Sequence, residues 1–201
     1  MRTRILALTL LLSAAGSGKA WALMEIEDDT IVFGLDAGIG NPFGGASKAM
    51  GPAGILGGQF LFHPTGERGV GLQVERFDFK RKNGGKVNMN AIMAAARFNN
   101  ILGGTNLYLP YVLIALGYGE SRADLPGNSD RGSGFAWRLG GGVDYMLSKS
   151  FSVATEARLD RIMAPLPLMG LSGATVLSLV LRLNLWFGPS ADPFRSGERR
   201  R

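Results

Sequence analysis

Seven charged residues stand at alternating positions in segments that otherwise contain small and large apolar residues. They are Asp36, Glu75, Arg138, Asp144, Glu156, Arg158 and Arg182. Successive side chains of a β-strand leave opposite faces of the sheet, so these charges share one face and the large apolar side chains share the other. Enclosed charges must pair, because an unpaired buried charge is far more costly than a paired one. The seven residues therefore predict an ion-pair network on the inner face of a closed sheet.

Counting along the expected strands indicates which of these charges meet. From the turn at 147–150, Glu156 falls diagonal to Arg138. From the shared ends of the last two strands and the first, Glu156 falls near Arg182, and Arg182 falls near Asp36. We expect the network to centre on these four residues. Two functions fit it: a structural plug that closes the interior, or a gate whose pairs exchange partners to pass water or small ions.

The other residues that could do chemistry form no reactive site. His63 is the only histidine and falls at the end of an expected strand, and the chain has no cysteine. The carboxylates have neither a histidine partner nor the spacing of metal ligands. The GSGK at 16–19 lies in an expected signal peptide, so it is not a phosphate-binding loop. We predict no catalytic residue, no metal site and no cofactor, and we do not expect an enzyme.

Eight segments with period-2 alternation would position the charges. In the hairpin 134–161, for example, Phe135 and Leu139 share one face while Arg138 lies on the other. The expected strands are 30–40, 54–63, 70–79, 87–98, 107–119, 134–146, 151–161 and 174–187. A soluble barrel encloses its bulky aliphatic residues and exposes its charges, and the partition here is reversed. We therefore predict an all-β fold, an eight-stranded antiparallel up-and-down transmembrane β-barrel.

The third and fourth strands have the least regular patterns. Phe77 and Phe79 fall on the same face as Glu75, and a β-bulge near Arg76 would return them to the outside. On the fourth strand, alternation sets an apolar face against a polar face that contains Asn88 and Asn90. The apolar face consists of Val87, Met89, Ala91 and Met93.

The two ends of the chain differ in composition from the barrel. Residues 1–22 combine Arg2 and Arg4, an apolar run and Ala20-Trp21-Ala22, which predicts a cleaved signal peptide. Its removal lowers the formal net charge from +6 to +3. The barrel would then occupy 23–187, and 188–201 would form a basic, disordered periplasmic tail. No basic stripe with interleaved aromatic residues occurs, so we expect no nucleic-acid binding.

The expected connections alternate in length. Those at 64–69, 99–105 and 147–150 are short, whereas those at 41–53, 120–133 and 162–172 are longer. The connection KRKNGGK at 80–86 is an exception to this alternation. Short periplasmic turns and longer extracellular loops are typical of outer-membrane barrels. Aromatic residues near the strand ends predict two interfacial girdles. These are Phe62, Phe79, Tyr108, Tyr118, Trp137, Tyr145, Phe151 and Phe187.

Four segments resemble the small OmpA-like outer-membrane β-barrel proteins of Gram-negative bacteria. They are PYVLIALGYG at 110–119, FAWRLGGGVDYMLSKSFSV at 135–153, TEARLD at 155–160 and SLVLRLNLWF at 178–187. The resemblance implies a location in the outer membrane, a monomer, and contact with outer-membrane lipid, lipopolysaccharide and the barrel-assembly machinery. It also implies an insertion signal at Leu185 and Phe187, although fourteen residues follow Phe187. We expect no peptidoglycan-binding domain in so short a tail.

A structural or surface-interaction role fits these observations best, with an extracellular ligand bound through loops 41–53, 120–133 and 162–172. A narrow channel for water or small ions is one alternative. A lipid A-modifying enzyme is another, since some eight-stranded barrels use a His–Ser pair near the outer surface, but His63 is expected at the periplasmic end. A soluble barrel of the lipocalin type would require the opposite partition of apolar and charged residues.

Overall fold

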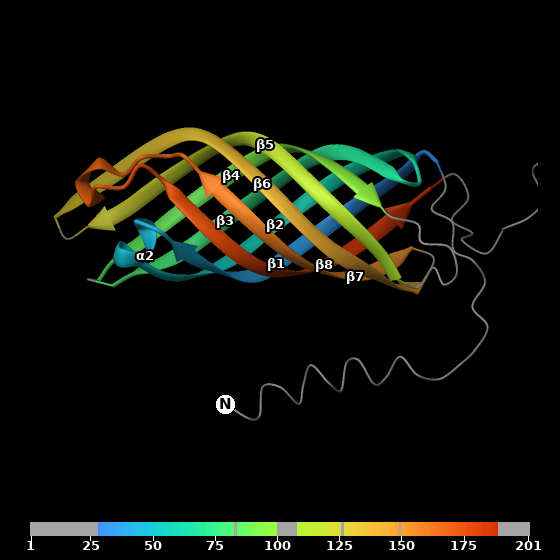
Figure 1. The fold of residues 1–201 in the computed structure, drawn as a ribbon, viewed down its shortest axis with the longest axis horizontal. Coiled ribbons are helices and arrows are strands. Elements are labelled where there is room, and N and C mark those ends of the chain that lie inside the picture. The colour runs from blue at the N-terminus through green and yellow to red at the C-terminus, as the bar shows by residue number, and fades with distance from the viewer. Residues whose placement is uncertain (1–27, 83, 100–107, 126, 149, 189–201) are drawn as a thin grey trace, which may run out of the picture.

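The computed structural model describes residues 28–82, 84–99, 108–125, 127–148 and 150–188. They form a closed barrel in which each strand is antiparallel to its neighbours and the last strand pairs with the first (Figure 1). The strands are β1 (Thr30–Phe43), β2 (Met50–Thr65), β3 (Arg68–Arg81), β4 (Lys86–Asn99), β5 (Tyr108–Leu125), β6 (Asn128–Ser148), β7 (Phe151–Ile162) and β8 (Ala174–Phe187). The predicted fold is confirmed. The expected signal peptide and almost all of the expected tail lie outside the described residues.

Two short helices lie at one end of the barrel. They are α2 (Ala46–Ala49), between β1 and β2, and the 3-10 helix η1 (Pro167–Met169), between β7 and β8. The first and last described residues lie together at the opposite end (Figure 1). No helix in the described part of the chain is long and apolar enough to cross a bilayer.

The outer face changes character at a constant height around the barrel. Starting from the end that holds the termini, the outward side chains of the strands are apolar up to one row of residues, apart from Thr155 and from polar residues such as Arg68 at that end itself. This row is Ile39, Leu56, Val74, Ile92, Tyr118, Phe135, Leu159 and Leu177. Beyond it the outward residues include Arg76, Asn90, Glu120 and Arg161. A face of this kind suits a lipid layer that ends at this row and water beyond it.

The interior has two layers. Near α2 it is apolar, and its largest side chains are Met50, Ile55, Phe77, Phe79 and Met89. The rest of the interior contains the buried charges. The expected bulge near Arg76 is wrong, because β2 and β3 pair without interruption from Ala53 and Phe79 to Phe62 and Val70. Phe77 and Phe79 stack inside the barrel, with ring centroids 6.3 Å apart, so Phe79 belongs to no girdle.

The β4 residues that the sequence pattern set as the apolar face point inward and not outward. Val87, Met89, Ala91 and Met93 point inward, and Asn88 and Asn90 point outward. The part of β4 from 86 to 91 extends beyond the lipid, where water is outside and apolar side chains are therefore best placed inside. The same change of solvent explains why the neighbouring Phe77 and Phe79 are inside.

The strands are longer than predicted, and two of the expected loops are accordingly shorter. Pairing of β5 with β6 continues to Leu125 and Asn128, so most of 120–133 is strand. The connection expected at 41–53 shrinks to 44–49. In the apolar loop 162–172, Leu166 and Leu171 are buried against the barrel mouth. The sequence pattern did not predict these extensions of β5 and β6, because their outward residues are polar and do not continue the apolar pattern of the lipid-facing part.

Candidate functional site

Among the described residues, ten charged side chains are buried in the barrel. One is Asp130, which accepts a hydrogen bond from the Leu168 N–H in η1. The other nine are the arginines Arg97, Arg138, Arg158 and Arg182 and the acids Asp36, Glu75, Asp144, Glu156 and Asp160. All of them stand at inward positions of the strand alternation. Small inward residues leave room for their side chains. A Cβ on Gly140, for example, would lie 3.1 Å from the Cβ of Arg158 and 3.5 Å from the carboxyl group of Glu156.

Arg138 binds two carboxylates and one amide. Its Nη1 and Nη2 donate to Glu75 at 3.0 and 2.8 Å, and its Nε donates to Asp160 at 2.5 Å. Nη1 also donates to Gln73 Oε1 at 2.8 Å. Arg138 and Asp160 are direct partners in the β6–β7 register, so the backbone itself brings this pair together.

Arg158 lies among four carboxylates. It pairs with Glu75 and lies within 3.2 Å of Asp160, 3.5 Å of Glu156 and 3.7 Å of Asp36. Its Nε has no hydrogen-bond partner among the described residues. A guanidinium surrounded in this way shares its single positive charge among several acids.

Arg182 spans the seam between β8 and β1. It donates to both carboxylate oxygens of Asp36, at 2.5 and 3.0 Å, and to Glu156 Oε2 at 2.9 Å. The Tyr111 hydroxyl donates to the same Glu156 oxygen at 2.8 Å. Bidentate pairs of this type are the stronger form of ion pair.

The structure brings six of the seven predicted residues into one cluster: Asp36, Glu75, Arg138, Glu156, Arg158 and Arg182. The expected contact of Glu156 with Arg138 is wrong in the described structure, because Glu156 binds Arg182 and Tyr111 instead. The register explains the difference: Glu156 stands opposite Gly142, and Arg138 stands opposite Asp160.

Asp144 belongs to a second cluster nearer the end that holds the termini. It pairs with Arg97 and accepts hydrogen bonds from Asn184 Nδ2 at 2.6 Å and Ser152 Oγ at 2.8 Å. The Arg97 guanidinium also lies over the Tyr111 ring, 3.7 Å from its centroid, in a cation–π arrangement. Thus Tyr111 touches both clusters.

A chain of amides joins the two clusters. Gln73 Nε2 donates to Gln59 Oε1 at 3.1 Å, and Gln59 Nε2 donates to Asn184 Oδ1 at 3.2 Å. Because Gln73 also binds Arg138 and Asn184 also binds Asp144, one hydrogen-bonded network extends through the polar interior. Every one of the five acids contacts at least one arginine.

Our sequence reasoning missed Arg97, Asp160 and Tyr111 as members of the network. Asp160 is in phase with Glu156 and Arg158, so the alternation could have identified it. Arg97 is in phase with Met93 on β4, the face that the sequence pattern set as the apolar one. Tyr111 is in phase with the inward Leu113 and Ala115, so the alternation could have identified it as well.

His63 is buried at the end that holds the termini. Its Nδ1 lies 3.4 Å from Asn99 Nδ2, and its ring centroid is 5.6 Å from that of Trp186. No serine hydroxyl or carboxylate hydrogen-bonds to His63 among the described residues. Leu185 and Phe187, the expected insertion signal, point outward, and the Phe187 ring meets that of Phe33 edge-on at 5.9 Å.

Comparisons with known proteins show where else a barrel of this kind occurs. The family profile described as outer membrane protein beta-barrel domain matches residues 7–163. A search of the curated proteins returned no match.

Several solved structures have a similar fold at low sequence identity. Neisserial surface protein A is 13% identical and has a TM-score of 0.60, over 78% of this chain and 95% of that chain. Ail, the attachment invasion locus protein of Yersinia pestis, is 14% identical with a TM-score of 0.51, over 81% of this chain and 100% of that chain. Ail in complex with the heparin analogue sucrose octasulfate is similar at 14% identity and a TM-score of 0.50, with the same coverage.

Proposed function

The chain belongs to the outer membrane protein beta-barrel domain family and is located in the outer membrane, and from this premise we propose that it acts through its extracellular end while its interior stays closed. The barrel is a monomer in this proposal. It contacts outer-membrane lipid and lipopolysaccharide and is assembled by the barrel-assembly machinery. The end with α2 and η1 is extracellular, because short turns and the chain termini face the periplasm in such barrels.

The buried charge network is the observation that supports a closed interior. An eight-stranded barrel is just wide enough for side chains to fill. Here the arginines and acids bind one another across it, and an apolar layer with Phe77 and Phe79 lies above them. The acids have guanidinium partners already, so neither a substrate nor a passing ion finds a free carboxylate.

Conductance measurements test the closed interior. In planar bilayers we expect featureless traces from the purified barrel. Removing the Glu156 carboxylate in Glu156→Gln, which keeps the side-chain size, should leave the traces featureless if the other pairs still fill the interior. The matched control is Glu120→Gln, which changes an exposed carboxylate on the outer face of β5. Discrete openings in the unmodified barrel would overturn the proposal.

One observation favours a narrow channel as the second candidate. Arg158 contacts four carboxylates and leaves its Nε without a hydrogen bond, so it could move between partners without losing all of its ion pairs. In that case Glu156→Gln should change the open probability or the unitary conductance. Traces that stay featureless for the unmodified barrel and for the variant would remove this candidate.

The extracellular end offers a surface for the interaction role. We define the charged ridge as the outward residues of β3–β6 beyond the apolar row. They are Arg76, Asp78, Lys80, Lys86, Asn88, Asn90, Glu120, Arg122, Asp124, Ser129, Arg131 and Ser133. Five of them are basic and three are acidic. Strand pairing holds the ridge rigid, which lowers the entropy cost of binding a partner.

Binding of a sulfated saccharide tests the ridge. Ail has been crystallised with sucrose octasulfate, and we use that compound as the first probe. We expect the double variant Arg122→Gln/Arg131→Gln to lose retention on a resin that carries the probe. Arg68→Gln, an exposed arginine at the periplasmic end, should retain it. Equal retention by both variants would show that the ridge is not the binding surface.

A further inference from the structure

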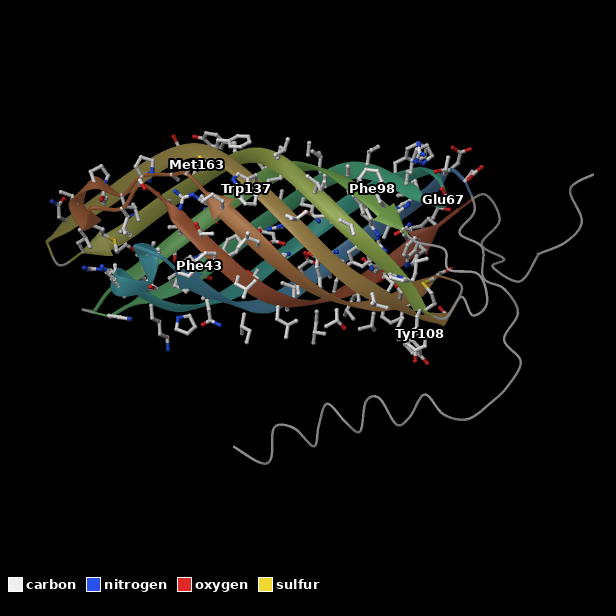
Figure 2. The ribbon with its side chains drawn as sticks, in the orientation of Figure 1. Phe43, Glu67, Phe98, Tyr108, Trp137 and Met163 are labelled. Atoms are coloured by element: carbon white, nitrogen blue, oxygen red, sulfur yellow. The ribbon has the colours of Figure 1, made fainter. Side chains whose placement is uncertain are left out.

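Four outward residues on neighbouring strands form a row at the extracellular edge of the lipid-facing surface. Arg161 on β7 stands directly opposite Thr175 on β8, and its Nη1 donates to Thr175 Oγ1 at 2.9 Å. Trp137 on β6 stands opposite Arg161, and Phe43 on β1 stands opposite Thr175. The row therefore has two polar side chains between two aromatic ones. Figure 2 labels Phe43 and Trp137 in the half of the barrel that holds the two short helices.

The depth of this row matches the lipid headgroups. Leu159 and Leu177, the last apolar outward residues of β7 and β8, lie one position below Arg161 and Thr175. Tryptophan and other amphipathic aromatic residues are enriched at the level of the headgroups. The Arg161 guanidinium is thus placed where lipid phosphates occur.

Arg161 lacks a counter-ion of the kind that the outward Arg76 and Arg122 have. Arg76 and Arg122 pair with Asp78 and Asp124, at 2.9 and 3.2 Å. Among the described residues no carboxylate oxygen lies within 4.0 Å of the half-buried Arg161. The chain also has no Asp or Glu between 37 and 66 or between 161 and 191, which covers β8 and both flanking loops. The local charge is positive and uncompensated.

A cavity of about 220 Å³ opens beside this guanidinium. Its walls are Arg161, Thr175, Phe43, the turn at 44–46 and the segment 170–173, which includes the Ser172 hydroxyl. Its lining contains no carboxylate. The turn at Gly44 and Gly45 combines a left-handed φ of 67° with a φ of −59°, and successive amides in such turns form anion-binding concavities. The volume is below that of a drug-sized site, so it suits a single charged group.

We propose that this cavity binds a phosphate group of an outer-leaflet lipid. The guanidinium presents two N–H groups side by side, which matches two phosphate oxygens. Thr175 Oγ1 accepts from Arg161, so its own hydrogen is available for a third phosphate oxygen. The lipid's acyl chains would then lie on the apolar surface below, next to Leu159 and Leu177. This inference does not depend on the charged ridge, which is formed by β3–β6.

Lipid retention by the purified barrel tests the proposal. The barrel is reconstituted in phosphatidylcholine vesicles that contain lipid A with its phosphates or lipid A stripped of them, and is extracted for native mass spectrometry. We expect retention of the phosphorylated form only. Arg161→Gln should lower that retention about tenfold or more, the loss expected for charge-assisted hydrogen bonds. The control is Arg68→Gln, an exposed arginine at the opposite end of the barrel, outside both the cavity and the charged ridge.

The competing outcomes are distinct. Equal retention of stripped lipid A would show that acyl chains alone bind, and equal retention by Arg161→Gln would show that binding is elsewhere; either result overturns the proposal. Displacement of the lipid by excess inorganic phosphate, with Trp137 fluorescence responding to phosphate alone, would identify a soluble anion as the ligand and overturn the lipid assignment. Gel mobility with and without heating verifies that each variant is folded.

Discussion

Asp36 and Arg182 face each other across the seam that closes the barrel, and the guanidinium binds both oxygens of the carboxylate. Nothing covalent joins β1 to β8, which are the two ends of the strand order. This buried ion pair therefore lies at the seam where β1 and β8 must pair in the correct register to close the barrel. The same arginine also holds Glu156, so the seam and the interior network share one residue.

Replacing Arg182 by Met should strongly destabilise the folded barrel. The substitution leaves Asp36 buried and without its bidentate partner, and breaking a buried pair in this way costs about 3–5 kcal/mol. Reversible urea unfolding in detergent micelles measures the loss. The double variant Asp36→Leu/Arg182→Met should recover part of it, since no charge then remains unpaired. Arg76→Gln, which breaks an exposed pair, should cost about 0–1 kcal/mol. Equal effects of Arg182→Met and Arg76→Gln would contradict the importance of the seam pair.

Arg97 should be as important to stability as the residues that the sequence pattern predicted. Arg97→Met leaves Asp144 without a cation and removes the cation–π contact with Tyr111, so we expect a loss of about 3–5 kcal/mol. Trp186 lies 5.7 Å from the Arg97 guanidinium, and its emission should shift as the site rearranges. Arg68→Met, an exposed change at the same end, is the control. If Trp186 emission stays unchanged while stability falls, the loss of stability does not come from a rearrangement around Arg97.

The alternation of small and large residues was enough to predict the barrel and most of its interior charges. It succeeded on β1, β7 and β8, where lipid faces the strand and outward residues such as Leu181 are unambiguously apolar. It failed where the strands leave the lipid. There Phe77 and Met89 point inward and Asp78 and Asn88 point outward. The apolar residues thus move from the outer face to the inner face, although the strand itself continues without interruption.

Pairing among the charges could be predicted only where the register could be counted. Asp36 and Arg182 are partners in the structure, as counting from the strand ends indicated. Arg138 is opposite Asp160, since the register of β6 and β7 shifts between Met146 and Ser148. Alternation gives the face of a residue, but the partner across the lumen depends on the barrel's stagger, which a single sequence does not contain.

Close packing of β2 and β3 should make Gly71 intolerant of any side chain. A Cβ at Gly71 would lie 1.9 Å from the Phe60 carbonyl oxygen, whereas a Cβ at Gly54 would meet nothing within 4 Å. Overpacking of this kind costs about 1–3 kcal/mol when the backbone has to shift. We expect Gly71→Ala to lower the urea midpoint and Gly54→Ala to leave it nearly unchanged. Identical midpoints for the two variants would show that the strands separate easily here.

The loss of stability caused by a charge on the outer face should depend on whether its position lies within the lipid or beyond it. Leu181 is 58% exposed midway along β8, so Leu181→Arg should cost about 2–4 kcal/mol in a bilayer. Ser133→Arg, on β6 beyond the apolar row, should cost about 0–1 kcal/mol. Unfolding in phospholipid vesicles measures both. The difference should largely vanish in detergent micelles with a thin apolar layer, and a large cost for Ser133→Arg would place the lipid boundary higher on the barrel.

Phe187 should affect assembly more than stability if it serves as the insertion signal. Its ring meets that of Phe33 at 5.9 Å, and the ring of Phe60 meets the same Phe33 at 5.1 Å, so the two residues have similar packing. They are also comparably exposed, at 52% and 40%. Phe187→Ser and Phe60→Ser should therefore lose similar stability in urea. In proteoliposomes that contain the barrel-assembly machinery, only Phe187→Ser should fold markedly more slowly, because only Phe187 ends the last strand. Equal slowing by both variants would assign the effect to lost packing and remove the role of Phe187 as a signal.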